Sequence, residues 1–128
     1  MFVLRREETY EFPVDAKVPN ARIPGQHVVH RFHAVFRSLP VERSRALLKA
    51  ADQAQLRGEQ WTGDKDMMRE VLAGWRDGEV KGEDGQDLPF TEENLEAMLD
   101  NPFALAALTE AYRRSISGEQ VQARKRGN

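Results

Sequence analysis

Residues 28–37 read Val-Val-His-Arg-Phe-His-Ala-Val-Phe-Arg, and the alternation in this stretch decides the fold. Phe32, Ala34 and Phe36 occupy even positions, whereas Arg31 and Arg37 occupy odd ones. Alternate side chains of a β-strand lie on the same face of its sheet. The pattern therefore predicts a strand with one buried face.

The residues nearer the N-terminus show the same parity, which predicts another strand. The apolar side chains on even positions there are Phe2, Leu4, Tyr10, Phe12 and Val14. Residues 15–26 contain two prolines, a glycine and an asparagine, which indicate a loop too long for a tight hairpin turn. A sheet of two or three strands is marginal alone, so helices must cover its apolar face, while its edges can stay free for a partner strand.

Two helices are expected in the middle of the chain. The first starts at Pro40 and stops at Gly58, because proline fits the first helical turn and glycine favours a helix end. The second is expected from Asp64 to Arg76, where an apolar stripe covers one helix face. That stripe consists of Met67, Met68, Val71, Leu72 and Trp75.

Two further helices are expected after a glycine-rich acidic loop at residues 77–90. Thr91 is a plausible cap for a short helix, whose first turn holds acidic residues that suit the positive end of the helix dipole. Asn101 followed by Pro102 predicts the start of a last helix, which Gly118 ends.

The predicted fold class is α+β, with a small N-terminal antiparallel β-hairpin or sheet followed by about four α-helices. We expect a single domain over residues 1–118, with strands within 1–37 and helices within 38–118. Residues 119–128 have almost nothing to bury, so they are expected to form a flexible basic tail.

Composition excludes several classes of protein. The chain has 128 residues, of which 40% are apolar and 31% charged, and it contains no cysteine. Its size supports a core without disulfides, and no apolar stretch approaches the roughly 20 residues that span a bilayer. Because the apolar N-terminal residues precede the charged ones, the segment does not resemble a signal peptide. We expect a soluble intracellular protein.

Charge is distributed unevenly along the chain. Residues 1–57 hold ten basic and six acidic side chains, whereas residues 58–128 hold nine and fifteen. The acidic part would repel nucleic acid. One alternative is nevertheless a small regulatory protein whose basic N-terminal half contacts nucleic acid, through Arg31, Arg37, Arg43 and Arg45.

The sequence predicts no catalytic residue, no metal ligand and no cofactor. His27, His30 and His33 are spaced by three residues, but a strand places His30 on the face opposite the other two. The acidic loop fails the calcium-loop pattern, because a lysine and a leucine stand where oxygen ligands are needed. Pairs of neighbouring carboxylates are explained by helix capping or loop solvation.

Large apolar residues after residue 63 allow two interpretations. They can all be core residues, with Phe90 packed against the helix that follows it. Alternatively, they line a groove for an apolar segment of another protein, since methionine adapts to varied partners. The candidate protein-binding residues are Met67, Met68, Val71, Trp75, Leu88, Phe90 and Met98.

Several short segments, which cover about a third of the chain, are structural rather than catalytic in kind. They are Val71-Leu72-Ala73-Gly74-Trp75, Glu83-Asp84-Gly85, Leu88-Pro89-Phe90-Thr91-Glu92-Glu93-Asn94-Leu95, Asn101-Pro102, Ala107-Leu108 to Tyr112, and Phe36-Arg37-Ser38-Leu39-Pro40. Together these segments resemble the tail assembly chaperones of lambda-like phages, which have long non-contractile tails.

The resemblance implies a non-enzymatic protein of the host cytoplasm that is absent from the mature virion. Its expected partners are the tape measure protein, whose long apolar helices it keeps soluble, and the tail tube protein, whose subunits it recruits. Self-association also fits such a role, whereas no membrane or nucleic-acid partner is expected.

Overall fold

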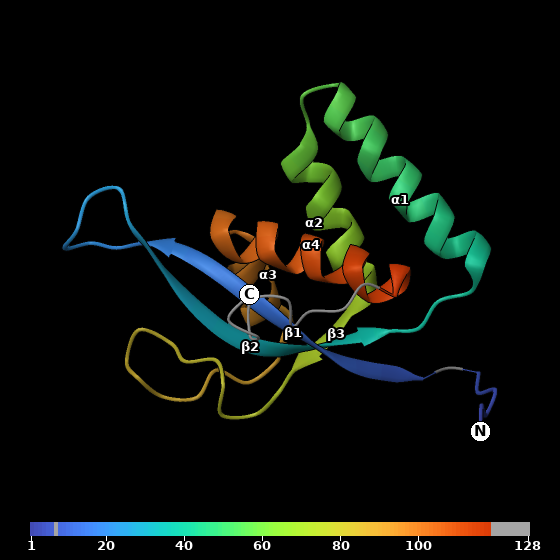
Figure 1. Ribbon diagram of the computed structural model, residues 1–128, viewed down its shortest axis with the longest axis horizontal. Coiled ribbons are helices and arrows are strands. Elements are labelled where there is room, and N and C mark those ends of the chain that lie inside the picture. The colour runs from blue at the N-terminus through green and yellow to red at the C-terminus, as the bar shows by residue number, and fades with distance from the viewer. Residues whose placement is uncertain (7, 119–128) are drawn as a thin grey trace.

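The computed structural model describes residues 1–6 and 8–118, in which a three-stranded antiparallel sheet is combined with four helices (Figure 1). This arrangement confirms the predicted α+β class. The elements follow in the order β1 (Thr9–Pro19), β2 (His27–Arg37), α1 (Val41–Leu56), α2 (Gln60–Val71), β3 (Leu72–Trp75), α3 (Glu92–Leu99) and α4 (Pro102–Ser117). The tail predicted for residues 119–128 lies outside the described residues.

Strands β1 and β2 pair along their full length, from Thr9 opposite Arg37 to Pro19 opposite His27. The even residues face the helices as predicted, and Phe32, Ala34 and Phe36 are buried. The end of this hairpin that contains the turn projects past the helices as an arm (Figure 1).

The bounds of β1 differ from the prediction at both ends. Phe2 and Leu4 keep the parity of the strand but lie before it, and their side chains are 85% and 83% exposed. Conversely, the strand continues through residues expected to form a loop, because Asp15 pairs with Arg31 across the hairpin at 2.8 Å and Ala16 is still buried. The turn is therefore confined to residues 20–26.

The expected second helix is wrong at both ends. Helix α2 begins at Gln60, a turn before Asp64, and it gives way to β3 at Leu72. Two backbone carbonyls at this change, those of Glu70 and Leu72, accept hydrogen bonds from Arg37 Nη1 at 2.9 and 3.0 Å. Pairing with the edge of β2 replaces the helical hydrogen bonds that the last residues of the predicted helix would have made.

Capping residues fix the start of α3 and both ends of α4 as predicted. The Thr91 hydroxyl accepts a hydrogen bond from the backbone N–H of Asn94 at 3.1 Å. The Asn101 side chain accepts from two backbone N–H groups at the start of α4. Gly118 ends this helix with φ +78°, a left-handed conformation that glycine adopts without strain.

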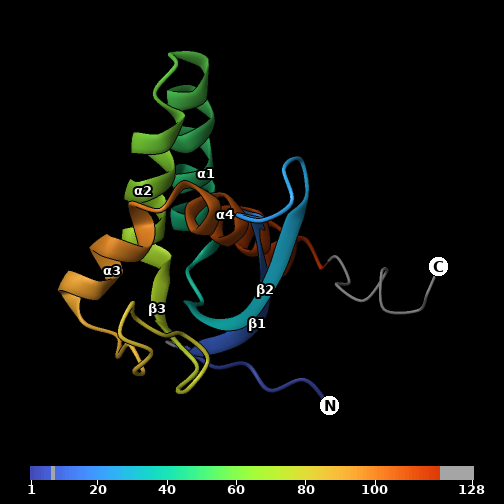
Figure 2. The ribbon, with the colours of Figure 1, turned by 90° about the vertical axis from the view of Figure 1, so that its left-hand side faces the viewer.

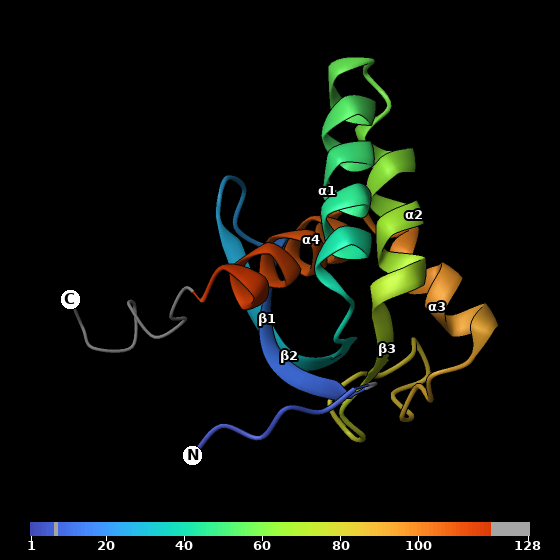
Figure 3. The same ribbon diagram turned by 90° about the vertical axis from the view of Figure 1, so that its right-hand side faces the viewer.

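The core lies between the sheet and the helices. Helix α4 packs across the sheet, where its Tyr112 meets Phe36 edge to face with ring centroids 5.4 Å apart. Helices α1 and α2 lie side by side as a hairpin that stands away from the sheet, as Figures 2 and 3 show from opposite sides. Within the described residues, no helix is long and apolar enough to cross a membrane.

Candidate protein-binding surfaces

The seven candidate protein-binding residues divide into two groups. Four are buried in the core, namely Met67, Met68, Val71 and Trp75. The other three, Leu88, Phe90 and Met98, are half-buried and pack against that core. In this conformation only the second group offers surface to another protein.

Trp75 connects the two groups. Its indole Nε1 donates a hydrogen bond to the carbonyl oxygen of Leu88 at 2.7 Å, and its ring meets Phe90 edge to face with centroids 5.0 Å apart. These contacts fold the segment after β3 back onto the sheet. They indicate that Trp75 and Phe90 are core residues, as the first interpretation of the sequence predicts. Leu88 and Met98 pack against the core and also line a groove.

That groove runs beneath the hairpin arm, and we call it the arm groove. It has a volume of about 740 Å³ and lies between the helix-facing side of the arm, the segment after β3, and helices α3 and α4. Its apolar lining includes Val18, Phe32, Val80, Leu88 and Met98. Glu79 and Glu83 also line it, so it combines an apolar interior with acidic side chains.

A second apolar surface runs along α1, and we call it the α1 groove. It has a volume of about 630 Å³. Its apolar lining comes from Leu39, Val41, Leu48, Leu56 and Ile116. Val41 and Leu56 stand 77% and 88% exposed, although both are large apolar side chains on a regular helix.

The α1 groove arises because α1 carries two apolar stripes. Leu47, Ala51 and Ala54 follow i, i+4, i+7 spacing, and of these the two alanines are buried. Val41, Leu48 and Leu56 are spaced by seven and eight residues, which places them together on a different face. The difference in spacing is the sequence signal that distinguishes the two stripes.

The four arginines considered for nucleic-acid binding form ion pairs or hydrogen bonds within the protein. Arg31 pairs with Asp15, and Arg37 donates to the two carbonyls at the α2–β3 junction. Arg43 forms a bidentate ion pair with the Glu70 carboxylate, and Arg45 Nη1 lies 3.8 Å from Glu42 Oε2. Each of these four arginines therefore has a carboxylate or a backbone carbonyl of the protein as its partner.

The histidines lie along β2 and do not converge. His33 Nδ1 lies 3.1 Å from the Glu79 carboxylate, whereas the exposed His30 lines the arm groove on the opposite face. Among residues 1–6 and 8–118, no three His, Asp or Glu side chains are grouped so that they could hold a metal ion.

Asp64 and Glu79 are among the carboxyl groups whose pKa values are shifted. Burial raises the pKa of Asp64 above its ordinary value, and nearby Asp52 adds to this, while attraction to Arg113 opposes it. Burial also acts to raise the pKa of Glu79, but hydrogen bonds from His33 and the charge of Arg76 outweigh it, so the net shift is downward. Glu79 is thus held as a carboxylate beside the arm groove.

Comparison with known proteins yields no relative. No protein-family model matches the chain, and neither the curated proteins nor the solved structures give a significant match.

Proposed function

We propose that the chain is a tail assembly chaperone of a long-tailed, non-contractile phage. In this role it binds the tape measure protein in the host cytoplasm, keeps it soluble and recruits tail tube subunits. The observation that carries the proposal is the second apolar stripe of α1, because large apolar side chains exposed together mark a site for another polypeptide.

The shape and chemistry of the α1 groove suit an amphipathic helix. Val41, Leu48 and Leu56 follow the helix axis, so a partner helix laid alongside can place its own apolar side chains between them. Arg45, Lys49 and Asp52 line the same groove and offer charged groups to the polar margin of that partner. Helices of a tape measure protein are partners of this kind.

Binding along this face requires no rearrangement of the core. The only buried residues of α1 are Ala51 and Ala54, which face α2. Leu48 of the groove also packs against the core, whereas Val41 and Leu56 are exposed and lie apart from the core-facing surface of α1. A substitution on the groove side can remove client binding and leave the fold intact, which makes the proposal testable.

The test is co-expression of the chain with the tape measure protein of the same phage, followed by gel filtration. The wild-type chain is expected to keep the tape measure protein soluble in a complex. The double variant Val41→Asp, Leu56→Asp should lose the complex, because it puts charge into the apolar groove. Ala50→Asp is the matched control, since Ala50 is exposed on α1 but does not line the groove.

Two outcomes would contradict the proposal in different ways. If the wild-type chain leaves the tape measure protein insoluble and forms no complex, the chaperone function is wrong. If the double variant binds as well as the control does, the client occupies a different surface. Retention on heparin that weakens with salt would instead favour the nucleic-acid alternative.

A further inference from the structure

Strand β2 has an open hydrogen-bonding edge next to the arm groove. Strand β3 pairs with β2 only from Ala34 to Phe36. On the same side, the His33 carbonyl accepts from the Arg76 N–H at 2.9 Å and the His33 N–H donates to Glu79 at 2.8 Å. Because alternate residues direct their backbone groups to the same edge, those of Arg31 and Val29 also point to this side.

No strand within the described residues covers this part of the edge. The described sheet has the order β1-β2-β3, and β3 is too short to reach Arg31 and Val29. An extended segment can therefore add here as a further strand. Its inward side chains would enter the arm groove, whose lining includes Phe32 of the same strand.

The N-terminal segment has the properties that such a strand needs. Met1, Phe2, Val3 and Leu4 are all apolar and exposed, and they lie before the first strand. In an extended conformation Phe2 and Leu4 point to the same side. This segment could place those two side chains in an apolar groove while its backbone pairs with β2.

The charges of the N-terminal segment also complement those of the arm groove. Arg5 and Arg6 directly follow the apolar residues. The arm groove is lined by Glu79 and Glu83, and also by Lys81, whose ammonium group pairs with Asp87. These residues belong to the segment 77–96, which has eight acidic residues and one lysine. Opposite charges at the margin would orient the segment and speed its association.

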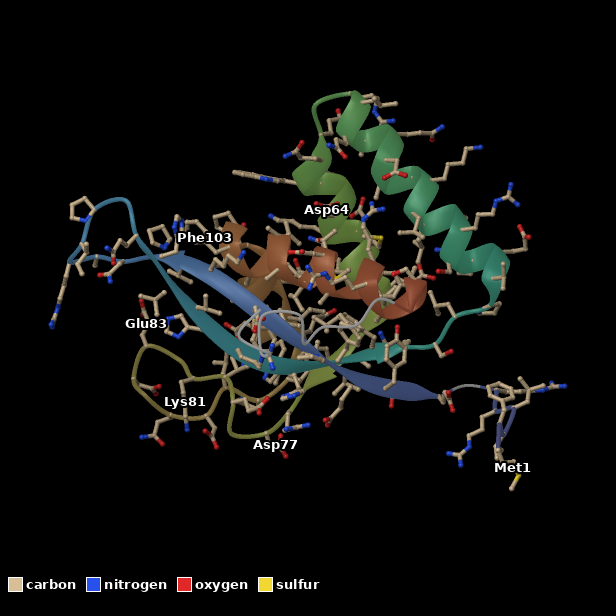
Figure 4. All side chains as sticks on the ribbon, viewed as in Figure 1. Met1, Asp64, Asp77, Lys81, Glu83 and Phe103 are labelled. Atoms are coloured by element: carbon tan, nitrogen blue, oxygen red, sulfur yellow. The ribbon has the colours of Figure 1, made fainter. Side chains whose placement is uncertain are left out.

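The segment cannot reach the far end of the groove in its own molecule. Glu8 is held by the Ser38 N–H, which donates to its carbonyl at 2.9 Å. Phe2 can extend at most about 25 Å from Thr9 and Leu4 about 18 Å, whereas Val18 lies about 30 Å from Thr9 along β1, at about 3.3–3.6 Å per residue. Figure 4 shows Met1 at one end of the molecule and Glu83 toward the other.

We propose that Met1–Leu4 of one copy adds as a strand to the β2 edge of a second copy and places Phe2 and Leu4 in its arm groove. The chain thereby associates with itself through a donor segment and an acceptor groove. This association requires no client, so it is independent of the proposed chaperone function.

The experiment uses two complementary variants of the full chain. The donor variant Phe2→Asp, Leu4→Asp has an altered segment and an intact groove. The acceptor variant Ala97→Arg keeps the segment and blocks the groove, since Ala97 lines it from the exposed side of α3. Sedimentation or light scattering should show concentration-dependent association of the wild type and at least tenfold weaker association of each variant alone.

Mixing the variants gives the decisive result. One intact segment and one intact groove are then present, so the mixture is expected to form one-to-one complexes that neither variant forms alone. A peptide of residues 1–6 should also bind the donor variant with one-to-one stoichiometry. Circular dichroism spectra like that of the wild type would establish that both variants are folded.

Trp61→Asp is the matched control for this experiment, because Trp61 is an exposed apolar residue, 62% accessible, that lines neither the arm groove nor the α1 groove. It should associate as the wild type does. The proposal is overturned if the wild type stays monomeric at every concentration, if the donor variant associates normally, or if the mixture forms no complex. None of these results bears on client binding through the α1 groove.

Discussion

Gly63 of α2 lies so close to Ala54 of α1 that a Cβ atom added to Gly63 would come within 2.6 Å of the Ala54 Cβ. The backbone of Ala51 is also near, with its Cα 3.4 Å from the same position. Small residues thus allow the two helices to pack closely at this point. Neither helix can add a side-chain atom here without moving the other.

Gly63→Ala is expected to destabilise the protein, although alanine favours a helix by about 1 kcal/mol over glycine. Overpacking of this kind costs about 1–3 kcal/mol, and urea denaturation would measure the net change. Ala54→Gly should restore part of the loss, because it removes the atom that clashes. A Gly63→Ala variant more stable than the wild type would show that the helices separate easily.

Trp75→Phe should destabilise the protein by about 1–3 kcal/mol, because the Leu88 carbonyl loses its indole donor while half-buried. Limited proteolysis should then cleave the segment between β3 and α3 faster. Trp61→Phe serves as the control, since Trp61 is 62% exposed and its change should stay within about 0.5 kcal/mol. Equal effects of the two substitutions would contradict the assigned role of Trp75.

Asn101→Ala should cost about 1 kcal/mol, because the side chain caps α4 by accepting hydrogen bonds from Phe103 N–H at 3.0 Å and Ala104 N–H at 3.1 Å. Asn101→Asp retains an acceptor and should preserve most of the stability. Thermal denaturation of the two variants would measure the difference. If alanine and aspartate behave alike, the cap does not stabilise the helix.

The raised pKa of Asp64 predicts a specific pH dependence. The folded protein binds the proton more tightly than the unfolded chain, whose aspartate pKa is about 3.9. The resulting stabilisation is complete below that value and is lost as pH rises through the higher folded pKa. Asp64→Asn does not titrate, so its stability relative to the wild type should increase across this window.

Urea denaturation of both proteins from about pH 3 to about pH 7 would test this dependence. A relative stability that falls with rising pH would show that attraction to Arg113 outweighs burial. A direct carboxyl titration by nuclear magnetic resonance would then give a pKa for Asp64 below the ordinary value.

The part of the fold that could be predicted from the sequence depends on local patterns. The parity of Phe32, Ala34 and Phe36 predicted β2, and Thr91 and Asn101 predicted where α3 and α4 begin. These features are local because strand alternation and capping each involve residues a few positions apart.

The errors arose where distant residues decide the outcome. Leu72 and Trp75 fit a helical stripe, but the open edge of β2 draws them into a strand, with Arg37 holding the junction. Phe2 and Leu4 fit the parity of a strand and yet have no partner strand in the described fold. Spacing alone contains no information about either pairing.

The sequence alone could not decide whether the candidate residues form a core or a partner surface, for a related reason. Met67 and Trp75 are apolar whether they face a core or a partner, and only the packing of α4 and the sheet distinguishes these cases. Leu56 is not among the candidate protein-binding residues, because the sequence alone does not show that it is exposed. Only the helix places it in line with Val41 on the surface.

The small residues between α1 and α2 have a consequence for local opening. Helix α1 buries only two alanines, whereas α4 buries seven residues, among them Leu108 and Tyr112. Separating α1 from the rest exposes these alanines and the partly buried Leu47 and Leu48, which is less apolar surface than α4 buries. The amide hydrogens of α1 should therefore exchange with deuterium before those of α4. The protein would then have an outer helix that opens on its own while the sheet and α4 stay closed.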